Sequence, residues 1–104
     1  MAKNLMKTFE LAYQDVFNAI YDYINAKKIH RVSLGFSFKE VTETDNIQEV
    51  TFKKIYIEND DLFVDYSVYE FETQEINNYS CELVDFSMNE LYLIILHFWN
   101  ECYK

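Results

Sequence analysis

Hydrophobic residues recur at steps of three and four over the first part of the chain, which is the pattern of an amphipathic helix. The apolar positions are Leu5, Phe9, Ala12, Tyr13, Val16, Phe17, Ile20, Tyr23 and Ile24. Lys27 and Lys28 follow them, and cations at that place complement the negative end of a helix dipole. The pattern therefore predicts a helix that ends between Ala26 and Lys28.

The hydrophobic period then changes to two, which is typical of half-buried β-strands. In the segment 32–39 the apolar residues are Val32, Leu34, Phe36 and Phe38. The opposite face would carry Ser33, Gly35, Ser37 and Lys39. These small side chains suit a solvated face, and they also leave room for the backbone of a partner. A polar loop is expected over 40–48.

Two further strand-like segments, 50–58 and 62–72, are joined by Asn59, Asp60 and Asp61. These residue types suit a tight turn, so the sequence predicts a β-hairpin. Residues 73–80 are expected to form a loop, and 81–86 a short fourth strand.

The first arm of this hairpin changes phase, because the apolar residues Val50 and Phe52 give way to Ile55 and Ile57. Such a change predicts either a bulge near Lys53 and Lys54 or a strand that is covered on both faces.

The final segment opens with Ser87 and Glu90 at the spacing of a capping box, which predicts that a helix begins at Ser87. From Leu91 to Trp99 every residue except His97 is apolar or aromatic. The stripe expected to face the core is Leu91, Ile94, Ile95, Phe98 and Cys102. A second apolar stripe comprises Tyr92, Leu93, Leu96 and Trp99, and contiguous apolar patches commonly mark interfaces.

These elements predict an α+β fold: an N-terminal helix, an antiparallel sheet of three to four strands and a C-terminal helix, arranged as a two-layer sandwich with the helices on one face. A length of 104 residues fits a single domain over 1–104. Half of the residues are hydrophobic, which is too apolar for a disordered chain.

The charge of the chain is distributed unevenly. Between Glu40 and Asp85 there are thirteen carboxylates and two lysines, a net charge of −11 in 46 residues. The first 39 residues carry +3 and the last 19 carry −1, so the three parts sum to −9. A negative electrostatic field over one part of a protein repels polyanions and attracts basic surfaces. The charge pattern therefore restricts the class of partner that the protein can bind.

Catalytic, metal and cofactor sites have little support in the sequence. A single glycine excludes a glycine-rich phosphate loop, and His97 and Cys102 are about 140° apart on a helix, so they share no face. The cluster of Glu58, Asp60 and Asp61 lacks the alternating ligands and central glycine of a calcium-binding loop. We expect no enzyme, no metal and no cofactor.

Direct binding to nucleic acid is also not expected, because the few cations do not form the clustered basic surface that phosphate contacts require. The N-terminal segment has neither the pattern of a signal peptide nor that of a transmembrane span. With only two cysteines, Cys81 and Cys102, we expect reduced thiols, a cytoplasmic location and no membrane association; for a phage-encoded chain this means the host cytoplasm.

The charge pattern leads to a hypothesis of electrostatic mimicry. An acidic hairpin would dock into the basic groove of a protein that normally holds nucleic acid, such as a nucleic-acid-guided or restriction nuclease, and inhibit it. Carboxylates two residues apart on one strand face, such as Glu70 and Glu72, would be about 6.6 to 6.8 Å apart, a separation comparable to the charge spacing of an extended polynucleotide. The residues expected to bind the partner are Glu58, Asp60, Asp61, Asp65, Glu70, Glu72 and Glu75.

In element order and acidity the chain is similar in general character to small phage-encoded anti-CRISPR and anti-restriction proteins, although no motif assigns it to them. Three alternatives stay open. The acidity can serve solubility alone; Tyr92, Leu93, Leu96 and Trp99 can form a homodimer or an assembly contact; or the chain can be an immunity protein that neutralises a basic toxin.

Overall fold

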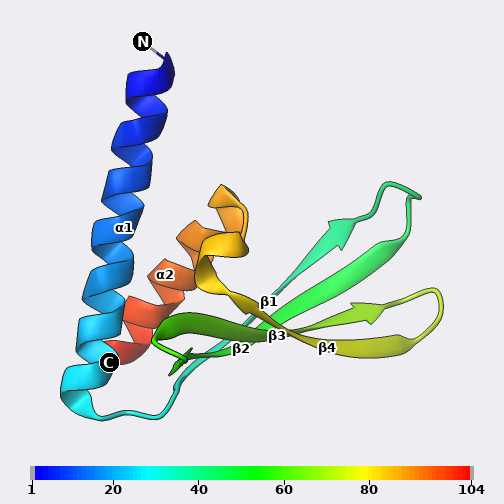
Figure 1. Cartoon of the computed structure of the whole chain (residues 1–104). Helices are drawn as coiled ribbons and strands as arrows, with labels where there is room; N and C mark the ends of the chain where they lie inside the picture. The colour runs from blue at the N-terminus through cyan, green and yellow to red at the C-terminus, as the bar shows by residue number, and fades with distance from the viewer. Residues whose placement is uncertain (1, 104) are drawn as a thin grey trace. The chain divides into compact units, whose positions relative to one another are not determined.

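The computed structural model describes residues 2–103, with side chains from Gln14 onward. Its elements are α1 (Ala2–Lys27), β1 (Val32–Val41), β2 (Ile47–Glu58), β3 (Asp61–Glu70), β4 (Glu75–Glu82), the 3₁₀ turn η1 (Leu83–Asp85) and α2 (Met88–Cys102) (Figure 1). One antiparallel sheet with a helix before it and a helix after it confirms the predicted α+β fold. The chain divides into two compact units, residues 1–30 and 31–104.

The first unit is α1, which ends at Lys27 within the predicted range. Lys28 adopts a left-handed conformation with φ 53°. The amide of Lys28 donates to the carbonyl of Asn25, and that of Ile29 donates to the carbonyl of Ile24, both at 3.2 Å. This is a Schellman ending, which satisfies carbonyls that the helix leaves unpaired. The predicted apolar positions Leu5, Phe9, Ala12 and Tyr13 lie outside the residues whose side chains are described.

In the second unit the four strands form an antiparallel meander in the order β1-β2-β3-β4. The hairpin between β2 and β3 was predicted at the correct place. Glu58 pairs with Asp61, and both Asn59 and Asp60 have positive φ values, 51° and 64°. Asparagine and aspartate tolerate this conformation, which a two-residue turn of type I′ requires.

The predicted bulge on β2 is also confirmed. The pairing of β2 with β3 shifts between Phe52 and Lys54, so Lys53 is the additional residue. A second shift occurs on β1 between Ser33 and Phe36, where Gly35 has φ +61°. A side chain at Gly35 would be strained in this conformation, which explains the only glycine of the chain. Bulges on neighbouring strands increase the local twist of a sheet.

A fourth strand is present as predicted, but its predicted position, 81–86 after a loop over 73–80, was wrong. Residues 75–82 form the strand β4, and Leu83–Asp85 form a 3₁₀ turn rather than a strand. The turn between β3 and β4 is instead short: Gln74 has φ 58°, and its amide donates to the carbonyl of Glu70 at 2.8 Å. The sequence of this strand lacks the hydrophobic alternation that would have predicted it, because it contains the polar residues Asn77, Asn78 and Ser80. Their strand conformation comes from pairing with β3.

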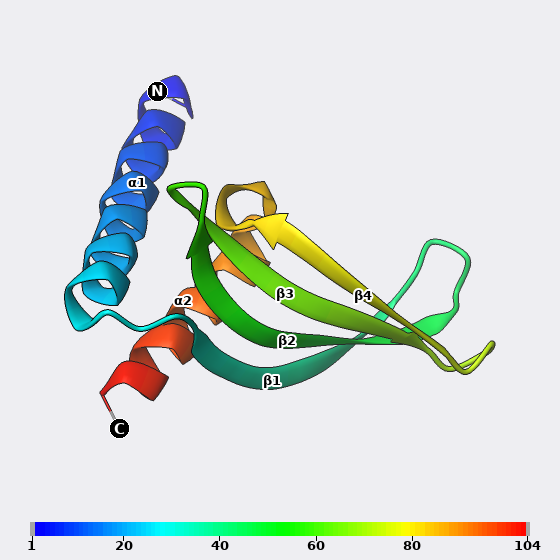
Figure 2. The same ribbon diagram turned by 60° about the horizontal axis from the view of Figure 1, so that its bottom comes forward.

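One face of the sheet carries the apolar side chains, and α2 lies against it on the side of β1 (Figure 2). Phe52, Ile55 and Val64 of the sheet and Ile94 and Phe98 of α2 are fully buried. The imidazole of His97 stacks on the ring of Phe36, with 3.9 Å between centroids and 8° between planes.

The capping box predicted for α2 is present. The hydroxyl of Ser87 accepts from the amide of Glu90, and the Glu90 carboxylate accepts from the amide of Ser87. Of the stripe predicted to face the core, Leu91, Ile94 and Phe98 are buried, whereas Ile95 and Cys102 are half-buried.

Candidate functional site

The face of the sheet opposite the core is polar. Ser37, Thr51, Ser67 and Asn78 follow one another across the four strands in register. The hydroxyl groups of Ser37 and Thr51 are 3.0 Å apart, and the ammonium group of Lys53 donates to the side-chain carbonyl of Asn78 at 2.8 Å. These contacts cross the sheet and leave this face rich in hydrogen-bonding groups.

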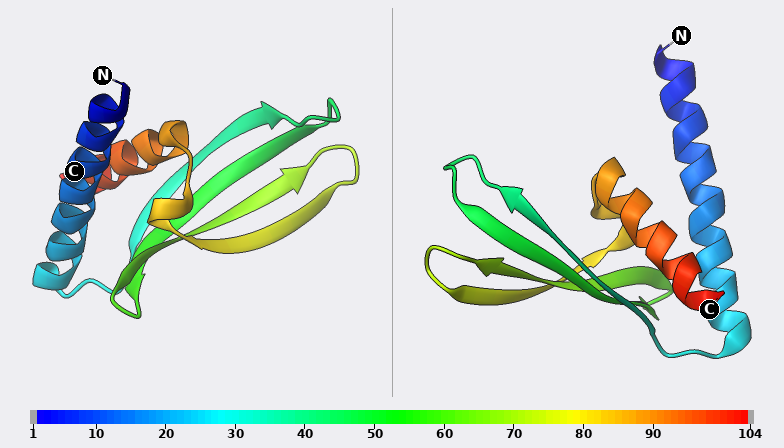
Figure 3. Two further views of the ribbon diagram at one scale, coloured as in Figure 1. Left: turned by 45° about the horizontal axis from the view of Figure 1, so that its top comes forward. Right: turned by 180° about the vertical axis from the view of Figure 1, so that it is seen from behind.

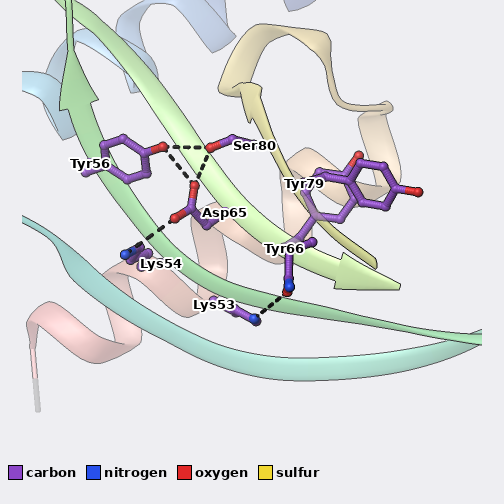
Figure 4. Close-up of a pocket in the computed structure, with 8 residues that line it drawn as sticks. Lys53, Lys54, Tyr56, Asp65, Tyr66, Tyr79 and Ser80 are labelled. Carbon is purple, nitrogen blue, oxygen red and sulfur yellow. Dashed lines mark hydrogen bonds and ion pairs between the residues drawn. The ribbon is translucent and has the colours of Figure 1, made fainter. Parts of the chain in front are cut away.

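A hollow of about 430 Å³ opens on this polar face. Residues from β2, β3 and β4 line it (Figure 4): Lys53, Lys54, Tyr56, Asp65, Tyr66, Asn78, Tyr79 and Ser80. The bulge positions Lys53 and Lys54 here, because an additional residue alters the alternation of side chains along β2.

The carboxylate of Asp65 accepts three contacts inside the hollow. The hydroxyl of Tyr56 donates to it at 2.8 Å, the hydroxyl of Ser80 donates to the same oxygen, and the ammonium group of Lys54 lies 3.4 Å from the other oxygen (Figure 4). We call Lys54, Tyr56, Asp65 and Ser80 the polar clamp, because they join β2, β3 and β4.

The contacts within the polar clamp shift the pKa of Asp65 and the pKa of Tyr56 in opposite directions. Burial opposes ionisation of Asp65, but the hydrogen bonds from Ser80, Tyr56 and Lys54 outweigh it, and the pKa of Asp65 is lowered. Burial, together with the bond to Asp65, raises the pKa of the Tyr56 hydroxyl, although its contact with Ser80 acts in the opposite direction.

This protonation pattern does not activate a nucleophile. A carboxylate with a lowered pKa is a poor general base, and a tyrosine with a raised pKa stays neutral. Among the residues that the structure describes, no group of three or more His, Cys, Asp or Glu side chains is arranged to hold a metal ion. The contacts of the polar clamp connect β2, β3 and β4 on the outer face of the sheet.

The strongest charge cluster lies at one end of the sheet. In an antiparallel meander the β1–β2 loop and the β3–β4 turn lie at the same end (Figure 1). We call the segments 39–49 and 69–76 the acidic end. It contains Glu40, Glu43, Asp45, Glu49, Glu70, Glu72 and Glu75.

Three of these carboxylates lie in a single row across the sheet. Glu40 pairs with Gln48, Gln48 with Glu70 and Glu70 with Glu75. Paired residues point to the same face, and neighbouring strands are about 4.8 Å apart. The side-chain amide of Gln48 donates to the carboxylate of Glu40. Glu70 and Glu75, in contrast, are like charges directly opposite each other, which is unfavourable.

Lys39 is the only cation in the segments 39–49 and 69–76, which leaves the acidic end with a net charge of −6. It pairs with Glu49 in the register of the strands, and its ammonium group lies 5.2 Å from the centre of the Phe71 ring. Both turns are ordered by hydrogen bonds: the amide of Thr42 donates to the carbonyl of Asn46 at 2.8 Å, in addition to the bond within the β3–β4 turn.

The residues predicted to bind a partner fall into three groups. Glu70, Glu72 and Glu75 belong to the acidic end, although Glu72 lies in the turn and not on a strand. Glu58, Asp60 and Asp61 lie at the β2–β3 turn, which is the opposite end of β3, about 30 Å away by strand length. Asp65 lies between them, in the polar clamp. They do not form one continuous hairpin surface.

Sequence reasoning did not single out Glu40, Glu43, Asp45 and Glu49 as binding residues. They became part of the site because the β1–β2 loop and the β3–β4 turn lie at the same end of the sheet. The signal that could have found them is the succession of strands joined by short turns, since alternate turns of an antiparallel meander share an end.

The four residues of the alternative helix face differ in exposure. Tyr92 is 62% exposed and Leu96 41% exposed, whereas Leu93 and Trp99 are half-buried. Met88, four residues before Tyr92 on α2, is also exposed. Met88, Tyr92 and Leu96 therefore form an apolar stripe along α2.

Comparisons of the chain with protein-family models, with curated proteins and with solved structures found no match. Within residues 2–103 no helix has both the length and the apolar character needed to cross a membrane.

Proposed function

We propose that this protein is a small acidic binding module that inhibits a partner by occupying a basic groove of that partner, one that normally holds nucleic acid. The acidic end is the proposed contact surface. The observation that supports it best is the gathering of seven carboxylates and one lysine at one end of the sheet, on two turns and on the strand ends that lead into them.

Two features argue for recognition by the acidic end beyond solubility. Solubility requires only dispersed charges, whereas here three glutamates share one row of the sheet. Glu70 and Glu75 oppose each other at a cost to the stability of the β3–β4 pairing. A basic partner would convert this repulsion into attraction, because each carboxylate would then have a cation nearby.

The test is capture of a partner by the tagged protein from a lysate of the native host. The lysate is first treated with nuclease, so that nucleic acid cannot link the tagged protein to other proteins. The variant Glu40→Lys, Glu43→Lys, Glu72→Lys should lose capture. Its matched control is Glu58→Lys, Asp61→Lys, Asp85→Lys, which changes the net charge by the same six units, from −9 to −3, at other positions. Equal loss in both variants would show that net charge alone matters.

A second assay separates inhibition from mere association. The captured partner is titrated with labelled nucleic acid in the presence and in the absence of the protein. Competition, in which added protein raises the apparent dissociation constant for nucleic acid, supports occupation of the groove. A ternary complex would contradict it. A basic toxin that binds no nucleic acid would favour the immunity-protein alternative.

The apolar stripe of Met88, Tyr92 and Leu96 favours a second candidate function, association through α2 as a homodimer or an assembly contact. The two candidates respond to salt in opposite ways, because exposed charges are screened whereas apolar contacts are not. Sedimentation of the wild type and of Tyr92→Ser, Leu96→Ser at low and high salt tests this candidate. A dimer that persists at high salt and dissociates in the variant would support it.

A further inference from the structure

The strand β4 is an edge of the sheet, and no second strand in the described part of the chain pairs with its outer side. Its only strand neighbour there is β3 (Figure 3). Six of its eight residues, Glu75 to Ser80, are exposed. One side of β4 therefore presents a row of backbone amides and carbonyls that no neighbouring strand pairs.

Natural proteins usually protect such an edge with proline, charged side chains, a bulge or a very short strand. Of these, β4 has only two charged side chains, Glu75 and Glu82 at its ends. The chain contains no proline, β4 contains no lysine, and its pairing with β3 runs without a shift from Phe63–Glu82 to Glu70–Glu75. Eight residues are also enough for continuous pairing with an added strand.

We propose that β4 binds an extended basic segment of a partner protein, which pairs with it as a fifth strand. This inference deepens the proposed function and rests on it, because it supplies a backbone contact to the same basic partner. Addition of a strand to a sheet edge takes its affinity from main-chain hydrogen bonds and its specificity from alternate side chains.

The side chains of β4 specify the chemistry of the segment. Glu75 and Glu82 lie at the two ends of the strand, seven residues apart, so they point to opposite faces. Ile76 is 60% exposed and Tyr79 47% exposed, and these also lie on opposite faces. An antiparallel segment of eight residues would thus carry cations at its first and eighth positions, and β-branched or aromatic residues at its fourth and seventh.

Charge argues against a second copy of this chain as the occupant. Full-length antiparallel pairing of β4 with itself would place Glu75 opposite Glu82 of the other copy, at both ends of the new strand pair. Like charges directly opposite each other are destabilising. A basic segment replaces both repulsions by attractions.

The experiment uses the full chain and the labelled peptide Lys-Thr-Thr-Val-Thr-Thr-Val-Lys, followed by fluorescence anisotropy and by amide chemical shifts. We expect saturable binding with the largest shift changes in residues 75–82. The same peptide with glutamate in place of both lysines should bind at least about tenfold more weakly, by loss of two opposite-charge pairs. The variant Glu75→Lys, Glu82→Lys should reverse this preference, and that reversal also shows that the variant is folded.

Two proline peptides test whether the backbone is used. Successive backbone amides of a strand point to opposite sides. One peptide has proline at the fifth position and the other at the sixth, so one of them lacks an amide that faces β4 and the other lacks an amide that faces solvent. We expect one of the two peptides to bind about as tightly as the parent and the other to lose most of its binding.

Three results would overturn the inference: no binding of the parent peptide, equal binding of both proline peptides, or a dimer paired through β4 in the absence of peptide. These results are separable from failure of the proposed function. The variant Glu40→Lys, Glu43→Lys, Glu72→Lys leaves the residues of β4 unchanged, so it should still bind the peptide. If peptide binding fails while that variant still loses partner capture, only the inference about β4 falls.

Discussion

The two ends of the sheet differ in what their residues achieve. At the packed end, which carries Val32, Phe52, Ile55 and Val64, apolar side chains are buried against α2 and η1. At the acidic end the same strands carry exposed carboxylates, and the like charges Glu70 and Glu75 oppose each other. Figure 2 shows this end of the sheet extending beyond α2. Buried apolar contacts are thus concentrated at the packed end, and most residues of the acidic end are exposed.

This division has a simple physical basis. Burial of apolar surface contributes about 25 cal/mol for each Å², whereas exposed charges contribute little to folding. The acidic end can therefore vary without loss of the fold. The two regions should respond very differently to substitution.

The largest expected difference concerns the core. Phe52 is fully buried and its ring contacts Phe36, Tyr66 and Phe86. We expect Phe52→Ala to lower the free energy of unfolding by about 3 to 5 kcal/mol, because it removes buried apolar surface and leaves a cavity. The exposed Glu43→Ala should change it by no more than about 0.5 kcal/mol. Urea unfolding followed by circular dichroism measures both, and comparable effects would contradict the division.

The polar clamp lies between the two ends and should have an intermediate effect. Asp65→Asn removes the partner of Lys54 and weakens the bonds from Tyr56 and Ser80. Because the site is only partly buried, we expect a loss of about 1 to 2 kcal/mol in the free energy of unfolding. Glu72→Asn serves as the exposed control. If Asp65→Asn left the protein as stable as the wild type, the clamp would contribute nothing to stability.

The pH dependence of this loss has a defined sign. The pKa of Asp65 is lower in the folded state than in the unfolded chain, whose Asp pKa is about 3.9. Its stabilising contribution is therefore complete above that value and disappears as the pH falls through the folded-state pKa. The stability difference between the wild type and Asp65→Asn should be constant above about pH 5 and narrow below about pH 4. A difference that widens in acid would contradict the assignment.

At the packed end, the helix cap should have a smaller effect. Ser87→Ala removes the hydroxyl that accepts from the amide of Glu90, and we expect a loss of about 1 kcal/mol in the free energy of unfolding. Ser87→Asp keeps an acceptor and should restore most of it. If the aspartate variant were as unstable as the alanine variant, capping would not be the cause.

The smallest expected effect is a gain at the acidic end. Glu75→Lys places a cation opposite Glu70, so the free energy of unfolding should rise by about 0.2 to 1 kcal/mol. Raising the salt concentration should reduce this gain, because exposed charges are screened. A loss of stability would show that the two carboxylates are not in unfavourable contact.

The sequence predicted most of the packed end and little of the acidic end. Periodicity located the β2–β3 hairpin and the bulge beside Lys53, and the capping box located the start of α2, because each depends on residues close in sequence. The fourth strand was predicted at 81–86 instead of 75–82, since Asn77 and Asn78 have low strand propensity and pair through contacts with β3.

The composition of the candidate site depended on topology in the same way. Glu70, Glu72 and Glu75 were expected to continue the surface of Glu58, Asp60 and Asp61, because they belong to the same hairpin segment. Antiparallel pairing instead separates the two groups by the length of β3 and brings Glu40 and Glu43 to the same end of the sheet as Glu72 and Glu75. Proximity of this kind follows from strand order and cannot be read from spacing along the chain.

The most direct test of the central claim compares partner capture by two variants of equal net charge, Glu40→Lys, Glu43→Lys, Glu72→Lys and Glu58→Lys, Asp61→Lys, Asp85→Lys, at about 50 mM and about 500 mM salt. We expect the first variant to lose capture at low salt, the second to retain most of it, and the wild type to lose capture at high salt. Retention of capture by the first variant, or capture by the wild type that is independent of salt, would contradict recognition through the acidic end.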